Sequence, residues 1–165
     1  MGNLRDRIKA KAQHKTTYKM VIVDDATADA AEAAYTGSQT ALRRAVAAKD
    51  AKAQKTAQAA VDLARAGLAA CVDVLVFEAL ESHVFEALIV LHEPTEAQQA
   101  EGKQWNAETF SPALIAACSV EQGMTEAEWA EELATKRWSL ADRNDIFTKA
   151  LSANVTARSV TVPKG

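Results

Sequence analysis

The amino-acid sequence predicts a mainly α-helical protein of the α+β class, with a long alanine-rich helix and a small two-stranded antiparallel sheet. Three features indicate this fold class. The segment 26–70 is rich in alanine, the strongest helix former. Two short segments, 16–23 and 71–78, are rich in β-branched residues and are typical of strands. The C-terminal half contains several patterns that begin and end short helices.

Length and charge predict how the chain is organised. Its 165 residues suffice for one helical domain, which we expect at 16–154. A basic arm at 1–15 precedes this domain, because residues 1–20 carry six cations against one anion, Asp6. A flexible tail at 155–165 follows it. The two predicted strands are expected to pair, and helices must pack against so small a sheet to stabilise it.

A helix break is predicted inside the alanine-rich segment, at 35–38. Gly37 suits the C-terminus of one helix, and Ser38 can cap the next, so a long helix is predicted at about 39–66. Its apolar face is narrow and mostly alanine, which contributes little buried area per residue. We therefore expect it to need a partner helix, from its own fold or from a neighbouring subunit. Its apolar spacing does not hold a heptad, which argues against a long coiled coil.

The remaining helices, at about 82–154, are predicted from their ends. Ser82 opens a helix that Pro94 stops, and its Phe85, Leu88 and Ile89 share one face. Two capping boxes follow, and a Ser-Pro pair predicts a further helix start. The final helix is expected to place three apolar residues one above another. The residues concerned are Thr95 and Thr125 for the boxes, Ser111 and Pro112 for a helix at 113–119, and Ser139 with Leu140, Phe147 and Leu151 for the final helix.

No spacing signature of catalysis, cofactor binding or metal binding is found, and no residue is assigned to such a site. Glycine-rich phosphate loops and a nucleophile elbow are absent from the sequence. His83 and His92 lie about 13.5 Å apart along a helix, on roughly opposite sides, and so cannot share one ion. Cys71 and Cys118 lie in apolar surroundings and are expected to be buried, reduced thiols. We therefore predict a protein that is not an enzyme and has no cofactor.

Membrane and nucleic-acid partners are not predicted either. No apolar stretch approaches the roughly 20 residues of a membrane-spanning helix, and the charged N-terminus leads into no signal sequence, so a cytoplasmic location is expected. The basic arm lacks aromatic residues, and the region 78–132 carries twelve glutamates against one cation, Lys103. Such an uneven charge distribution favours ordered contacts between chains, including a homo-oligomer, although solvated helix faces would give the same pattern.

Five large aromatic residues in the last third of the chain are the candidate protein-binding residues. They are Trp105, Phe110, Trp129, Trp138 and Phe147. Aromatic rings on short, well-capped helices usually build a core. The alternative is that one or two of them anchor a partner chain.

Parts of the region 70–154 resemble the tail assembly chaperones of long, non-contractile-tailed bacteriophages of actinobacteria. The resemblance rests on Pro94-Thr95, on the run from Gln104 to Val120, on Met124 to Trp129, and on Trp138 to Phe147 with Ala150, Leu151 and Asn154. None of these segments is a catalytic signature. The alanine-rich segment resembles the family in composition only.

The resemblance implies a chaperone in the host cytoplasm that binds the tape measure protein and brings tail-tube subunits to it during virion morphogenesis. Such chaperones are commonly made in two lengths by a ribosomal frameshift. Apolar helix faces and abundant charge suit a protein that keeps a long helical client soluble. Two other classes stay open: a structural virion protein, such as a head–tail connector or tail completion protein, and a small enzyme whose site leaves no sequence signature.

Overall fold

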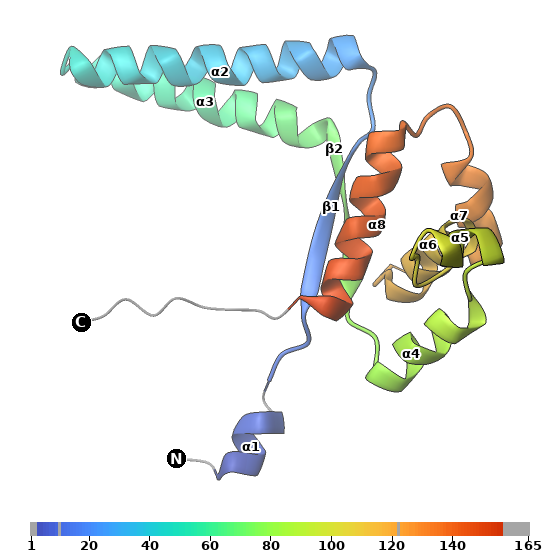
Figure 1. The fold of residues 1–165 in the computed structure, drawn as a ribbon. Helices are drawn as coiled ribbons and strands as arrows, with labels where there is room; N and C mark the ends of the chain where they lie inside the picture. The colour runs from blue at the N-terminus through green and yellow to red at the C-terminus, as the bar shows by residue number, and fades with distance from the viewer. Residues whose placement is uncertain (1–2, 10, 122, 157–165) are drawn as a thin grey trace. The chain divides into compact units, whose positions relative to one another are not determined.

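The computed structural model describes residues 3–9, 11–121 and 123–156 (Figure 1). These residues form eight helices and one small two-stranded antiparallel sheet, so the predicted fold class is confirmed. The chain divides into two compact units, where the sequence analysis expects one domain. One unit comprises Lys19–Val74, and the other comprises Met1–Tyr18 together with Leu75–Gly165. Both strands of the sheet run from one unit into the other.

The sheet consists of β1 (Lys15–Val21) and β2 (Val72–Glu78), close to the predicted segments. The backbone N–H of Ile22 donates to the carbonyl of Cys71 at 3.0 Å, and that of Ala79 donates to the carbonyl of His14 at 3.0 Å. This antiparallel register places Tyr18 opposite Leu75. An isolated antiparallel bridge between Phe77 and Ser119 extends the pairing beyond β2.

The unit Lys19–Val74 is built on a hairpin of two long helices, α2 (Asp25–Ala47) and α3 (Ala51–Ala70). The predicted break at Gly37 is wrong, because α2 continues through this residue. The chain turns instead at 48–50, where Lys49 has a φ of 55° and the carboxylate of Asp50 caps α3. A helical glycine costs only about 1 kcal/mol, and the surrounding alanines favour continuation. The predicted helix at 39–66 is therefore wrong in its bounds.

The other unit contains the remaining helices. They are α1 (Leu4–Lys9), α4 (Ser82–Leu91), α5 (Glu96–Ala100), α6 (Ala107–Cys118), α7 (Glu126–Leu133) and α8 (Leu140–Val155). The capping boxes predicted at Thr95 and Thr125 are confirmed, and Ser139 forms a third with Asp142. The predicted start of a helix at Ser111 is wrong. Asn106 caps α6, and Pro112 lies inside the helix.

The core of this unit surrounds α6, which packs on α4, α7 and α8. Its most buried side chains include Phe110, Leu114 and Ile115, each 0% exposed. Helix α8 buries Ile146, Ala150 and Ala153, so the predicted inward face was misjudged. Leu140, predicted to lie on that face, is the first residue of α8 and is 69% exposed.

The structure describes the two ends of the chain only in part. The predicted basic arm at 1–15 contains the short helix α1. Val155, expected to begin the tail, still belongs to α8, and the rest of that predicted tail lies outside the described residues from 157 onward. Among the helices of the described ranges, none combines the length and the apolar character that crossing a bilayer requires.

Candidate protein-binding groove

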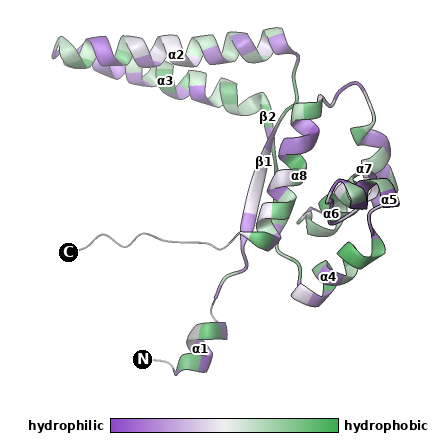
Figure 2. Cartoon of the chain, viewed as in Figure 1, coloured by the Kyte–Doolittle hydropathy of each residue, from purple (hydrophilic) through white to green (hydrophobic). Residues whose placement is uncertain are grey.

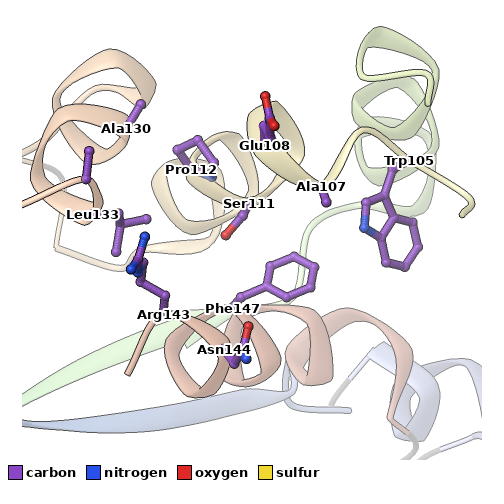
Figure 3. Close-up of a pocket in the computed structure, with 11 residues that line it drawn as sticks. Trp105, Ala107, Glu108, Ser111, Pro112, Ala130, Leu133, Arg143, Asn144 and Phe147 are labelled. Carbon is purple, nitrogen blue, oxygen red and sulfur yellow. The ribbon is translucent and has the colours of Figure 1, made fainter. Parts of the chain in front are cut away.

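A recess lies between α6, α7 and α8, closed at one end by Trp105 (Figure 3). Its volume is about 450 Å³. Figure 3 shows Pro112 and Ser111 of α6, Ala130 and Leu133 of α7, and Phe147 and Arg143 of α8 around one opening. We call this recess the α6–α8 groove. Its lining residues are Trp105, Ala107, Glu108, Ser111, Pro112, Ala130, Leu133, Ala134, Arg143, Asn144 and Phe147.

Two aromatic side chains form the apolar wall of the groove. The ring centroids of Trp105 and Phe110 are 4.9 Å apart, and Phe147 presents an edge to Trp105 at 6.3 Å and to Phe110 at 6.1 Å. Trp105 and Phe147 are partly exposed, whereas Phe110 is fully buried. Because Phe110 contacts both rings from the core, it holds the wall in place without lining the groove itself.

The other two aromatic candidates are buried in the same unit. Trp129 is 6% exposed and Trp138 is 7% exposed. Their ring centroids are 6.3 Å apart, and Trp138 also stacks on Tyr18 at 6.1 Å. The structure thus brings Trp105 and Phe147 to a surface that a partner can reach, and it places Phe110, Trp129 and Trp138 in the core.

Trp138 is tied to the end of α7 by a carboxylate. The indole Nε1–H of Trp138 donates to Oε1 of Glu132 at 2.9 Å, and the guanidinium of Arg137 donates to both oxygens of the same group. Hydrogen bonds from Arg137 and then from Trp138 lower the pKa of Glu132 below its ordinary value. Arg137 and Glu132 form an ion pair at the surface, where solvent screens its contribution to stability.

Groups of opposite charge line the groove, and its α6 wall contains a proline. Arg143 projects from α8, and Glu108 lies in the first turn of α6. Pro112 has no N–H, so the carbonyl of Glu108 lacks the donor that position i+4 normally supplies in a helix. A second recess, of about 330 Å³, shares Glu108, Pro112 and Ala130 with the first and continues toward Thr125. The groove therefore runs along the surface between α6 and α7.

Sequence reasoning found two lining residues and missed most of the others. Ala130, Pro112 and Glu108 carry no signal that could mark them, because a groove arises only where separate helices pack. Arg143 is exposed at the rim. The single available signal was the concentration of aromatic residues after residue 104.

The remaining candidate reactive groups are held in structural roles. Both cysteines are free and buried, as predicted. Burial raises the pKa of the Cys118 thiol, whose sulfur accepts from Nδ2 of Asn154 at 3.2 Å. Nδ1 of His92 is 2.9 Å from Oγ1 of Thr109, and its Nε2 is 4.0 Å from Oε1 of Glu126. Within the described ranges, no three His, Cys, Asp or Glu side chains gather closely enough to hold a metal ion.

No family model, curated protein or solved structure matches this chain. A functional proposal therefore rests on its own residues and on the geometry of the α6–α8 groove.

Proposed function

We propose that this protein is a phage tail assembly chaperone that binds the tape measure protein and helps recruit tail-tube subunits in the host cytoplasm. The observation that carries the proposal is the α6–α8 groove, an open apolar recess with two aromatic anchors and two charged groups at its rim. Most of the residues around it belong to the segments that resemble this family in sequence; Ala130, Leu133 and Ala134 lie outside them. On this proposal the protein acts by binding and has no catalytic step.

The groove has the chemistry of a site for an amphipathic helix. Such a helix inserts apolar residues spaced at i, i+3 or i+4 into a hydrophobic recess. Trp105 and Phe147 supply large, partly exposed rings of the kind that dominate binding energy at protein interfaces. Arg143 and Glu108 offer opposite charges, which orient a helix that carries charged residues beside its apolar stripe.

Charged residues outside the groove would help to keep a complex with a long apolar client in solution. Twelve glutamates and one cation lie between residues 78 and 132, and most of these carboxylates are exposed. Excess charge of one sign keeps protein complexes apart in solution. The hairpin α2–α3 buries only Ala45 and Val61, so much of its alanine-rich surface is open to further helices.

Co-expression with the tape measure protein of the same phage tests the proposal. We expect the tape measure protein to be soluble and to co-purify with the chain, and to aggregate when expressed alone. Blocking the groove with Ala130→Arg should abolish both effects. Ala130 is exposed at the rim, so the variant is expected to fold. The matched control is Ala141→Arg, because Ala141 is exposed on α8 and does not line the groove.

Two results would count against the proposal. Equal solubility of the tape measure protein with and without the chain would remove the chaperone role. Equal capture by the Ala130→Arg and Ala141→Arg variants would remove the groove as the client site. Mass spectrometry of purified virions separates the alternative class, because a head–tail connector or tail completion protein stays in the particle and a chaperone does not.

A further inference from the structure

Helix α4 presents an apolar face that the rest of its unit leaves uncovered. None of its residues is buried, although it is rich in apolar side chains (Figure 2). Val84 is 41% exposed, Val90 66% and Leu91 78%. Val84 and Leu91 are seven residues apart and lie on the same side of the helix, whereas Val90 lies about 100° from Leu91 around the axis, on the other side of the exposed Ala87. A surface helix normally turns such residues toward a core.

Glutamates border this face. Glu81 precedes α4, Glu86 lies one turn before Val90, and Glu93 follows the end of the helix; all three are exposed. In the whole segment 78–132 the only cation is Lys103. The uncovered surface of α4 is therefore apolar at its centre and negatively charged beside Val90 and at both ends of the helix. A complementary partner would be short, apolar along one stripe and basic beside it.

Helix α1 of this same chain has that character. Leu4 and Ile8 are four residues apart and lie on one side of the helix, 63% and 62% exposed. Arg5 and Lys9 are exposed beside them, and the first twenty residues carry six cations against one anion. A helix of six residues is marginal without a surface to pack on. Two exposed apolar residues and flanking cations match the size and charge of the α4 face.

We propose that α1 of one copy docks on the α4 face of a second copy. Leu4 and Ile8 would cover Val90 and Leu91, while Arg5 and Lys9 would face the glutamates that border α4. Each copy then offers one docking helix and one receiving face. Such a contact is heterologous, so it joins copies head to tail into a ring or an open chain. The interface is small, and the association is of the weak, concentration-dependent kind.

Sedimentation velocity of the full-length chain, over roughly three decades of concentration, measures this association. We expect the mean mass to rise with concentration at low salt and to fall back as salt is added. Reversing the charges of α1 with Arg5→Glu and Lys9→Glu should weaken association at least about tenfold. The matched control is Lys55→Glu with Arg65→Glu on α3, which changes net charge equally and should leave association unchanged.

A mixing experiment identifies the receiving face and shows that it belongs to another copy. Reversing α4 with Glu86→Lys and Glu93→Lys should also prevent self-association. Mixed with the α1-reversed chain, it should associate again into alternating copies of the two chains, because the acidic α1 of one meets the basic α4 of the other and the unchanged α1 and α4 meet at the next contact. A wild-type chain that stays monomeric throughout, as it would if α1 folded onto its own α4, overturns the proposal. So do reversed chains that associate like wild type, or a mixture that stays monomeric. Client capture through the α6–α8 groove is a separate measurement and is unaffected by these outcomes.

Discussion

Replacing Phe110 by alanine is the sharpest test of how the α6–α8 groove is held in place. Phe110 is 0% exposed and lies within 6.4 Å, centroid to centroid, of the rings of Phe85, His92, Trp105 and Phe147. Full burial of a phenylalanine is worth about 1.5–3 kcal/mol in transfer free energy. The cavity left among four rings adds to this loss, so we expect a total destabilisation of about 3–5 kcal/mol.

Urea unfolding followed by tryptophan fluorescence measures this effect. Trp105, Trp129 and Trp138 all belong to the unit that contains Phe110, so the signal reports on that unit. With an m-value of about 2 kcal/mol per M, the unfolding midpoint should fall by about 1.5–2.5 M. Leu140→Ala is the control, because Leu140 is 69% exposed and its loss should change stability by less than about 0.5 kcal/mol.

The same substitution has a consequence for binding. Without Phe110, Trp105 loses the ring on which it packs, so its position at the end of the groove becomes less defined. The tape measure protein should be captured more weakly even at temperatures where the Phe110→Ala variant is folded. A loss of stability below about 1 kcal/mol, or equal effects of Phe110→Ala and Leu140→Ala, would refute this account of the core.

Three further predictions concern single residues. Gly37→Ala should raise the thermal stability of the α2–α3 hairpin by about 0.5–1 kcal/mol, since the added Cβ would meet no atom within 4 Å beyond its own stretch of helix. Gly102→Ala should destabilise because its φ is 76°. Scanning calorimetry distinguishes a rise in melting temperature from a fall. Hydrogen bonds lower the pKa of Glu132 in the folded state. Its contribution to stability is therefore fully present above the unfolded-state pKa, near 4.5, and is lost as the pH falls through the folded-state pKa. Glu132→Gln should make the free energy of unfolding depend less steeply on pH in the acid range. The buried thiol of Cys118, whose pKa burial raises, should react with Ellman's reagent only as the protein unfolds, and rapid reaction of the native protein would contradict its placement.

The sequence predicted helix ends well where the signal is local. The capping boxes at Thr95 and Thr125 involve side chains three residues apart, and they form as expected. The strands were found for the same reason, since their β-branched residues are contiguous. Gly37 misled the prediction because a single glycine is a weak stop inside an alanine-rich helix. The turn at Lys49 has no glycine to mark it.

The candidate groove could be predicted only as a concentration of aromatic residues. Trp105 and Phe147 come from segments far apart in sequence, and their meeting depends on α8 packing against α6. Trp105 and Phe147 are partly exposed, whereas the other three aromatic candidates are buried. Periodicity alone could not do so, because Phe147 and the buried Ile146 are neighbours on the same helix. Which aromatic residue faces solvent is decided by the angle at which helices pack, and that angle is a tertiary property.

Pro112 links the least predictable helix to the proposed function. A proline usually begins a helix, and this rule placed the start of α6 too late. Inside a helix it costs about 3 kcal/mol, since it removes one hydrogen bond and its ring crowds the preceding turn. Helix α6 bears that cost at the point where Pro112 and Glu108 line both recesses of the groove. Rules of local structure are broken most often at functional or strained sites. Pro112 is itself buried, so its ring fills space in the core as well as lining the groove. Alanine at this position would restore the missing helix hydrogen bond but would leave that space empty, and the two effects on stability oppose each other.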